Sequence, residues 1–548
     1  MAARADAPAI YPVPWYRGRF ASWLVTTDHK RIGILYIWTS LFFFVVGGLL
    51  ALLIRTELLT PETADVVSRQ HFNQLFTMHG LTMVFLVIVP ILAGFGNYIV
   101  PLMIGAADMA FPRLNALSYW LLLLGGVVLY SAWFAKGGPA DTGWYLYPPY
   151  SEHTGTAVDL TILGLHLLAI SSLFGAINFV VTVHSLRTAG MTFMRMPLFV
   201  WTIYTYAWLL ILALPAVGAG LTMLLLDRQA GTHFFLPDEG GNALLYQHMF
   251  WFFGHPEVYV MVLPSFGIVS EVIPVFARKP IFGYAAIAFS TIGIAFVSML
   301  VWAHHMFAVG MPDVLNSFFM IASVLVAIPT GVKVINWLAT LWRGNLTFTT
   351  PMLFALGLVS VFTIGGLSGV MVAAFPFDWQ VHDTYFIVAH MHYVLFGGSI
   401  FGIFAGLYYW WPKMFGRMLD EGLGKLNFWL FFIGVNVTFG PQHFLGLLGM
   451  PRRVAGYRDA PWWDTWNIVS TIGSYTLGLG VLVFFVNVIR SRKSRRVGND
   501  PWQGETLEWY TTSPPPPHNF DKLPYISSPR PLRDLRRRLQ EKELGARA

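Results

Sequence analysis

Residues 245–276 read LYQHMFWFFGHPEVYVMVLPSFGIVSEVIPVF, a long run in which most side chains are apolar. A helix that crosses a bilayer needs about 20 predominantly apolar residues, so this run predicts a transmembrane helix. Its centre nevertheless carries His255, Glu257 and Tyr259. Ionisable side chains are costly inside a membrane and commonly mark function, so we expect this helix to carry part of a functional site.

Similar apolar runs recur along the chain and predict an all-α integral membrane protein, a bundle of twelve transmembrane helices. The predicted spans are 31–54, 76–105, 115–135, 158–186, 197–225, 245–276, 282–307, 315–341, 351–373, 384–410, 424–448 and 466–490. Several are longer than a bilayer requires, which indicates tilted or protruding helices. We expect one membrane domain at 31–490, flanked by an N-terminal tail at 1–30 and a C-terminal tail at 491–548.

The composition excludes several classes of protein. Only 11% of the 548 residues are charged and 55% are apolar, whereas soluble domains carry about 25% charged residues. A disordered chain, a nucleic-acid-binding module and an ordinary soluble enzyme are therefore excluded. There are no cysteines, which excludes disulfides, iron–sulfur clusters and thiolate-ligated haem. Any metal must bind histidine, carboxylate or methionine side chains.

The distribution of basic residues predicts the orientation in the membrane. Most of the 35 Lys and Arg residues fall in the two tails and in the loops on the same side. Because basic residues accumulate on the cytoplasmic side, we expect both termini in the cytoplasm. The net charge of +7 is then mainly a topology signal. The polar N-terminus predicts no cleavable signal peptide.

Six histidines from four predicted spans share one depth, in the outer third of the membrane. They are His79, His255, His304, His305, His390 and His392. An isolated histidine in a span is more often a packing residue, which is our interpretation of His166 and His443. Unrelated packing histidines would scatter in depth, so the shared layer predicts metal binding.

Helix geometry separates two of these histidines. His390 and His392 diverge by about 200° on a helix, so they can serve two different metals on opposite sides. His79 facing His392 would give a haem two histidine ligands. His390 alone would leave a coordination position open, as binding of a gas requires.

The remaining histidines suggest a copper site. His304 and His305 are adjacent, so they can share a metal only where the backbone is distorted; with His255 they form three imidazoles suited to copper. Tyr259 follows His255 by four residues and therefore stacks on the same helix face. A tyrosine beside a metal ligand could supply an electron and a proton.

Ionisable residues below the histidine layer suggest proton paths. Glu257 lies near mid-membrane and is a candidate relay. Lys333 carries Thr330 one turn away on the same face, which indicates a second path. Asp108 lies at the inner end of the second span and could collect protons from the cytoplasm. Two residues could extend a polar trail inward from it, Asn97 and Asn115.

Seven motifs carry a family resemblance. They are TMHG (77–80), FGNYIVPLMIGAADMAFPR (95–113), WFFGHPEVY (251–259), VWAHHM (301–306), AIPTGVK (327–333), HDTYFIVAHMHYV (382–394) and PQHFLGLLGMPRR (441–453). From about Asp28 to the end of the last span, the chain resembles subunit I of the haem–copper oxygen reductases, which is the catalytic subunit of cytochrome c oxidase. Within this family, the chain most resembles the branch that has two proton channels.

The resemblance implies cofactors and their ligands. It assigns His79 and His392 to a low-spin haem, His390 to the oxygen-binding haem, and His255, His304 and His305 to copper. It implies that Tyr259 is cross-linked to His255 and that both haems are of type A, although B or O haems would use the same ligands. It also implies Mg or Mn at His382 and Asp383, with help from subunit II.

The resemblance further implies proton channels and haem contacts. The first channel begins at Asp108 and ends at Glu257, by way of Asn97, Asn115, Asn178 and Ser171 or Ser172. The second leads to Tyr259 through Lys333, Thr330 and Ser270. The contacts to the haem periphery would come from Arg452 and Arg453, as partners of the propionates, and from Trp144 and Arg55.

The implied reaction is reduction of oxygen to water, coupled to proton pumping across a prokaryotic cytoplasmic (inner) membrane. The implied partners are subunits II and III, with cytochrome c donating electrons through subunit II, because a chain without cysteine cannot hold a thiolate-bridged copper centre. We expect no nucleic-acid partner.

Other functions share parts of this pattern. A quinol oxidase has the same core; His71 and Gln74 match its ubiquinol branch, whereas Val46, Leu50 and Asp383 depart from it. A nitric oxide reductase lacks the HPEVY tyrosine. A cofactor-free proton or ion transporter could use Glu257 and Lys333 as carriers but needs no histidine layer. A non-catalytic scaffold would have lost ligands, and none is missing.

Overall fold

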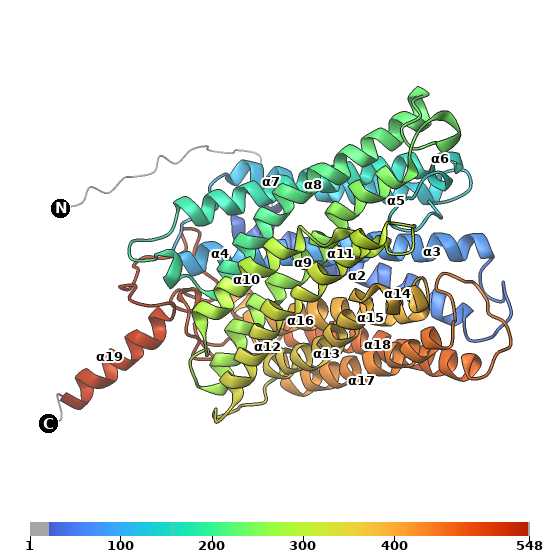
Figure 1. Ribbon diagram of the computed structural model, residues 1–548. Coiled ribbons are helices and arrows are strands. Elements are labelled where there is room, and N and C mark those ends of the chain that lie inside the picture. The colour runs from blue at the N-terminus through green and yellow to red at the C-terminus, as the bar shows by residue number, and fades with distance from the viewer. Residues whose placement is uncertain (1–20, 156, 546–548) are drawn as a thin grey trace.

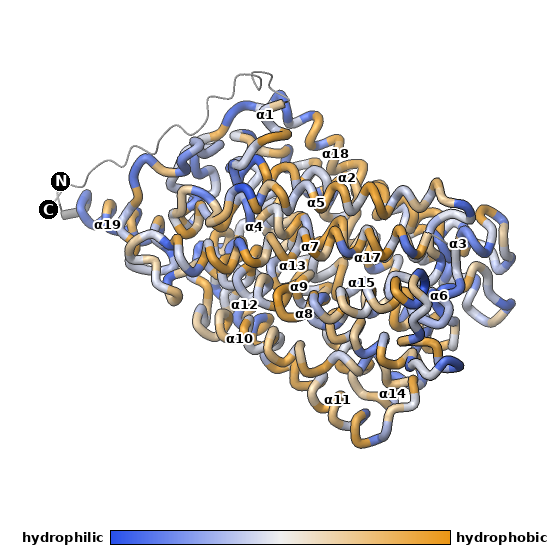
Figure 2. Tube along the Cα trace, turned by 90° about the horizontal axis from the view of Figure 1, so that it is seen from above, coloured by the Kyte–Doolittle hydropathy of each residue, from blue (hydrophilic) through white to orange (hydrophobic). Residues whose placement is uncertain are grey.

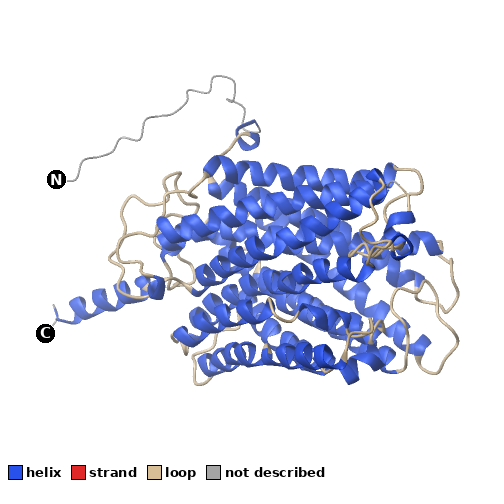
Figure 3. Cartoon of the chain, turned by 45° about the horizontal axis from the view of Figure 1, so that its top comes forward, coloured by secondary structure: helices blue, strands red, loops and turns tan. Residues whose placement is uncertain are grey.

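The computed structural model describes residues 21–155 and 157–545, and within these ranges the chain is helical and contains no β-strand (Figure 1; Figure 3). The α-helices are α1 Ala21–Leu24, α2 His29–Glu57, α3 Arg69–Thr82, α4 Val89–Ile104, α5 Pro112–Ser131, α6 Tyr150–His153, α7 Ala157–Ser185, α8 Leu198–Ala230, α9 Ala243–Ala277, α10 Tyr284–Ser298, α11 Asp313–Leu325, α12 Ala327–Leu341, α13 Thr350–Ala373, α14 Phe375–Val381, α15 Tyr385–Leu395, α16 Phe401–Phe415, α17 Glu421–Leu447, α18 Trp463–Ser491 and α19 Pro531–Gly545. The prediction of an all-α protein is confirmed. Residues 1–20 of the predicted N-terminal tail and 546–548 of the C-terminal tail lie outside the described residues.

Eleven helical segments of the described ranges are long and apolar enough to cross a membrane. Large apolar side chains such as Phe42, Phe296 and Leu367 are exposed on outward faces, as contact with lipid requires. More hydrophilic segments gather towards the two ends of the bundle (Figure 2). The structure is therefore that of an integral membrane protein.

The predicted span at 282–307 differs from the structure. The α-helix α10 ends at Ser298, and His304 and His305 lie on a 3-10 turn at Trp302–Met306. The expectation of one continuous helix is wrong in this outer part. On this turn both adjacent imidazoles reach His255.

Two other predicted spans contain a short π-helical segment. Met83–Ile88 joins α3 to α4 and begins four residues after His79. Phe396–Ile400 joins α15 to α16 and begins four residues after His392. Such segments are rare and frequently lie at functional sites. In both helices the departure from α-helical geometry therefore begins four residues after the histidine, and these two histidines face each other.

The bundle encloses α9 and the α3–α4 segment. In the most apolar stretch of α9, 94% of the residues are buried, and in that of the α3–α4 segment 89% are buried. Both values are higher than in any other described span. The helix pairs α8–α9, α5–α7 and α17–α18 pack closely. The helix that carries the HPEVY motif is therefore at the centre of the protein.

The C-terminal tail packs against the end of the bundle where α2 begins and α4 ends. Lys413, near the end of α16, donates from Nζ to the carbonyl oxygens of Thr511 at 2.8 Å and Asn499 at 3.2 Å. Trp502 Nε1 donates to the carbonyl of Tyr409 at 2.9 Å. The tail is irregular up to α19, which extends away from the bundle.

The approach of α13 to α15 can be tested at two adjacent glycines. A Cβ at Gly365 would lie 2.8 Å from the backbone carbonyl carbon of Tyr393, whereas a Cβ at Gly366 would have nothing within 4 Å. We expect Gly365→Ala to cost about 1–3 kcal/mol by overpacking and to lower the yield of folded protein. Gly366→Ala is the control. Equal yields and equal thermal unfolding of both variants would contradict this packing.

Candidate functional site

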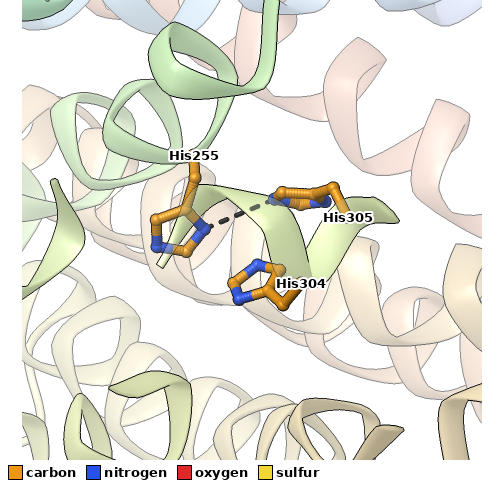
Figure 4. A group of neighbouring side chains, drawn as sticks. All are labelled: His255, His304 and His305. Atoms are coloured by element: carbon orange, nitrogen blue, oxygen red, sulfur yellow. Dashed lines mark hydrogen bonds between the residues drawn. The ribbon is translucent and has the colours of Figure 1, made fainter. Parts of the chain in front are cut away.

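Three histidines converge between α9 and the 3-10 turn (Figure 4). One ligand nitrogen of each of His255, His304 and His305 lies within 4.8 Å of the others. His255 Nδ1 and His305 Nε2 are 3.3 Å apart, and the ring centroids of His255 and His304 are 4.4 Å apart. Three neutral imidazoles around one point form a set that copper favours.

Neighbouring groups fix how these rings are turned. Ser323 Oγ donates its proton to the carbonyl of Phe319, so it accepts from Nδ1–H of His304 at 2.8 Å. This bond leaves the lone pair of His304 Nε2 available to a metal. His305 stacks on Trp251, with ring centroids 4.0 Å apart and planes at 12°. The site is thus oriented before any metal binds.

Tyr259 lies beside the cluster, as its spacing predicts. Its ring centroid is 4.8 Å from that of His255, one helical turn away. His255 Nε2 is buried and has no hydrogen-bond partner among the described residues. An unpaired buried nitrogen is costly, so this nitrogen is the atom of His255 that remains available for a further bond.

His79 and His392 face each other across a gap. Their ring centroids are 6.3 Å apart and their planes differ by 15°. Nδ1–H of His79 donates to the carbonyl of Gly47 at 2.9 Å, and Nδ1–H of His392 donates to that of Val388 at 2.8 Å. Because a carbonyl only accepts, Nε2 of each ring keeps its lone pair. A metal bonded to both rings at about 2 Å, the usual metal–imidazole distance, fits this gap.

His390 is oriented in the same way on another side of α15. Its Nδ1 lies 3.0 Å from the carbonyl of Gly365 and 3.0 Å from Ser368 Oγ. A Cβ at Gly369 would lie 3.0 Å from the His390 ring, so glycine leaves room for the imidazole. Its neighbour His392 instead stacks on Phe439, with centroids 4.1 Å apart. The two histidines therefore serve separate surroundings.

The predicted first proton path begins at a half-buried carboxyl. Asp108 lies in the loop between α4 and α5, and desolvation by burial raises its pKa to about 6. Asn178 binds the backbone of the same loop, accepting from Phe111 N at 2.9 Å and donating to Phe111 O at 3.1 Å. Asn178 thus holds the loop, in addition to lying on the predicted path.

Further along this path two asparagines are buried, and one of them, Asn97, lines a small cavity. Both side-chain polar atoms of Asn115 and Oδ1 of Asn97 are buried without a partner among the described residues. The cavity has a volume of about 10 Å³, roughly the space that one water needs, and its polar lining is Tyr36, Asn97, Ser171, Ser172 and Tyr206. Water there would satisfy amides that are otherwise costly to bury.

Glu257 is buried in α9, with 2% of its surface exposed. Its Oε2 has no hydrogen-bond partner, and no ion pair is found for it among the described residues. A buried carboxylate without a partner is costly, so the residue must carry or exchange a proton. The role of Glu257 as a proton relay stays a prediction.

Lys333 is fully buried, and its hydrogen bonds run to α10 rather than to Thr330 on its own helix. Its Nζ donates to Thr291 Oγ1 at 2.5 Å and to the carbonyl of Ile287 at 3.0 Å, both on α10. Thr330 Oγ1 instead donates to the carbonyl of Val326 within its own helix. Ser270 Oγ accepts from Trp337 Nε1 at 3.0 Å.

Charged residues gather at the opposite end of the bundle from Asp108. Arg452 donates from Nε and Nη2 to Asp383 Oδ1. His382 Nδ1 lies 2.8 Å from Asp378 Oδ2. Burial opposes protonation of His382, but the bond and charge of Asp378 outweigh it and raise the pKa of His382. The expected Arg452–propionate pairing therefore competes with an acidic neighbour in the chain.

The other residues expected near haem surround the same region. Arg453 lies over the ring of Tyr145, 4.3 Å from its centroid, and Trp144 packs edge-on against Trp251 at 5.9 Å. Arg55 Nη2 donates to the carbonyl of Asn467 at 2.8 Å. Nε and Nη1 of Arg55 are buried without partners among the described residues, so this guanidinium can still bind a polar group.

Sequence reasoning missed four residues that hold the expected ones in place. They are Ser323, Ser368, Thr291 and Asp378. Asp378 could have been found, because it precedes His382 by four residues and therefore shares its helix face. The hydroxyl residues carry no such signal, because serine and threonine are common in membrane helices.

Comparison with known proteins identifies the family. Cytochrome C and Quinol oxidase polypeptide I matches residues 31–476. Cytochrome c oxidase subunit 1 of Bacillus subtilis is 49% identical over 513 residues, covering 93% of this chain and 82% of the relative. Putative cytochrome c oxidase subunit 1-beta of Streptomyces coelicolor is 52% identical over 519 residues, covering 94% and 90%. A haem–copper terminal oxidase dimer solved by cryo-electron microscopy shares the fold, with a TM-score of 0.74, 20% identity and coverage of 86% and 85%.

Together the fold and the histidine clusters define the membrane subunit of a haem–copper oxidase. The chain belongs to the cytochrome c and quinol oxidase polypeptide I family. The predicted resemblance is confirmed, and with it the function as catalytic subunit of a terminal oxidase rather than a transporter or a scaffold.

The orientation of His304 by Ser323 gives a prediction about copper. Ser323→Ala removes the acceptor of Nδ1–H, and loss of such a supporting bond typically lowers metal affinity 10–100-fold, so we expect a drop of about 10-fold or more. The ratio of copper to iron in the purified enzyme after dialysis against a chelator measures this. Ser317→Ala is the control, because Ser317 lies on the same helix without a hydrogen bond among the described residues. Equal copper contents would contradict the role of Ser323.

Proposed function

We propose that this chain reduces oxygen to water at a haem–copper centre with electrons from cytochrome c, and that it couples the reaction to proton pumping. One observation carries the proposal: His79, His392, His390 and His304 each bind a chain oxygen through Nδ1 and keep Nε2 free. Metal-ligating histidines are typically held in this way. The free nitrogen of each of these four histidines is suited to binding a metal.

The proposed cofactors are two haems, of type A, and one copper ion. His79 and His392 would hold the low-spin haem, His390 the oxygen-binding haem, and His255, His304 and His305 the copper. When bound, these groups supply electrons and an open coordination position for oxygen. Arg55, Trp144, Arg452 and Arg453 would line the haem periphery.

The chain's own residues would supply protons. Tyr259 is one turn from His255 and can donate a hydrogen atom beside the centre. Glu257 can receive protons that enter at Asp108, beyond the loop that Asn178 holds, and that pass Asn115 and the cavity lined by Asn97. A second route would run through Ser270, Thr330 and Lys333 towards Tyr259. The buried Lys333, held by Thr291, supports it.

A Mg or Mn ion is proposed at His382 and Asp383. Asp378 binds Nδ1 of His382 at 2.8 Å, which leaves Nε2 available. That nitrogen lies 4.0 Å from Asp383 Oδ2, so both atoms can face one ion. The carboxylate oxygen suits Mg or Mn, and further ligands would come from subunit II.

The proposed topology has twelve spans and both termini in the cytoplasm. Eleven spans follow from length and apolarity, and α10 with the following 3-10 turn would be the twelfth. The membrane domain would then comprise 31–490, with cytoplasmic tails at 1–30 and 491–548. We infer a prokaryotic inner membrane, with subunits II and III as partners, because the relatives of known organism are bacterial.

Cytochrome c is proposed as the donor rather than quinol. Relatives named cytochrome c oxidase support it, as do Val46 and Leu50 at the positions where the ubiquinol branch carries an Arg and an Asp. Reduced-minus-oxidised spectra of the purified complex, with and without carbon monoxide, test the proposal. Two haems reduced by cytochrome c are expected. Reduction by quinol alone would assign the quinol branch, and absence of haem would overturn the function.

The relay role of Glu257 predicts a selective loss. Glu257→Gln keeps the size of the side chain but cannot exchange a proton, so we expect oxygen consumption to fall at least 100-fold with a nearly unchanged haem spectrum. Glu239→Gln is the control, since Glu239 lies on a surface turn. Full turnover of Glu257→Gln would refute the relay.

The raised pKa of Asp108 predicts a pH-dependent change in stability. A carboxyl whose pKa rises from 3.8 to about 6 on folding destabilises the native state once ionised, fully above about pH 6 and not below the unfolded value. Asp108→Asn removes that cost. We expect its thermal midpoint to exceed that of the wild type at about pH 8, and the difference to vanish as the pH falls towards 4. A constant difference would show that desolvation of Asp108 is not the cause.

A further inference from the structure

The C-terminal tail reaches the loop that carries Asp108. Asn519 is fully buried, and its Nδ2 donates to the carbonyls of Ala106 at 2.8 Å and Ala107 at 3.1 Å. These two residues immediately precede Asp108 in the chain. A side chain more than 400 residues away in sequence thus satisfies the backbone at the start of the proposed proton path.

The same amide also binds the first turn of α2. Nδ2 of Asn519 lies 2.9 Å from His29 Nε2, and Oδ1 accepts from Lys30 Nζ at 2.9 Å. His29 Nδ1 in turn donates to the carbonyl of Asn97 at 2.7 Å. Because that carbonyl only accepts, Nε2 of neutral His29 accepts a hydrogen bond from one N–H of Asn519 Nδ2, and the carbonyls of Ala106 and Ala107 share the other N–H. One hydrogen-bonded chain therefore connects the tail to Asn97.

The backbone at Asn519 is specialised for this position. Its φ is +67°, in the left-handed region where asparagine is enriched among non-glycine residues. Thr511 Oγ1 donates to its carbonyl at 2.5 Å, and its own N–H donates to the carbonyl of Pro516 at 3.0 Å. The tail holds a strained turn, and the turn directs the amide into the bundle.

We propose that Asn519 is a positioning residue for proton entry, which fixes the 105–111 loop and so keeps Asp108 partly shielded from solvent. This inference rests on the proposed role of Asp108. The charged and titratable groups near Asp108 are Asp28, His29 and Lys30 at the start of α2, and Asn519 binds two of them. Asn519 lies beyond residue 476, where the family match ends, so this contact joins the tail to the membrane domain.

Two variants separate the amide from the backbone turn. Asn519→Gly tolerates the positive φ but removes every side-chain bond. Asn519→Asp keeps the size but replaces the donor nitrogen by an oxygen, which faces the carbonyls of Ala106 and Ala107. His518→Ala is the matched control, because the neighbouring His518 is exposed and pairs with Asp521 inside the tail.

Turnover of the complete oxidase is measured as a function of pH, together with its haem spectrum. Without the hydrogen bonds of Asn519, water reaches Asp108, and the pKa of Asp108 falls from about 6 towards its ordinary value of 3.8. Less of the acid is then protonated at each pH. We expect both variants to keep the haem spectrum and Asn519→Gly to move the alkaline limb of the profile about 1 unit lower. In Asn519→Asp the added carboxylate opposes this shift, because a nearby like charge raises the pKa of Asp108. His518→Ala should follow the wild type.

Three results would overturn the proposal. They are a profile identical to the wild type, an equal loss at every pH, and loss of haem absorption in both variants, which would make Asn519 purely structural. Asp108→Asn is measured in parallel. If it alters proton-coupled turnover while the Asn519 variants do not, only this inference fails. If Asp108→Asn has no effect, the proposed proton entry fails with it.

Discussion

Burying an imidazole nitrogen in an apolar bundle is costly unless the nitrogen has a partner, and the arrangement of the site follows from this constraint. A neutral histidine has one donor and one acceptor nitrogen. The chain supplies an oxygen for Nδ1 of His79, His304, His390 and His392. The other nitrogen of each ring is left for a ligand that the chain itself does not provide.

Meeting that constraint requires helices that approach closely. Two of the oxygen atoms are glycine carbonyls on neighbouring helices, those of Gly47 and Gly365. Gly365 lies against the backbone of Tyr393, and Gly369 leaves room for the His390 ring. A larger side chain at these positions would separate α13 from α15 and move the acceptor away from the imidazole. Helix packing and ligand orientation are therefore one requirement, met by the same glycines.

The sequence predicts those features of the protein that depend on composition and on helical periodicity. Apolar length places the spans, and helical spacing brings Tyr259 to His255 and separates His390 from His392. The departures arise where tertiary contacts decide: the 3-10 turn under His304 and His305, the π segments, and the pairing of Lys333 with Thr291. No local pattern encodes these, because each depends on which helix lies opposite.

The same constraint acts at the other end of the bundle. Carbonyl groups in the last turn of a helix have no partner within it, and those of the loop after α4 are in a similar position. Asn519 supplies donors to the loop carbonyls of Ala106 and Ala107, while Lys413 supplies donors to the tail in return. Each side therefore satisfies groups that the other leaves exposed. The tail and the membrane domain are therefore joined at this end by reciprocal hydrogen bonds, and residues of both lie near Asp108.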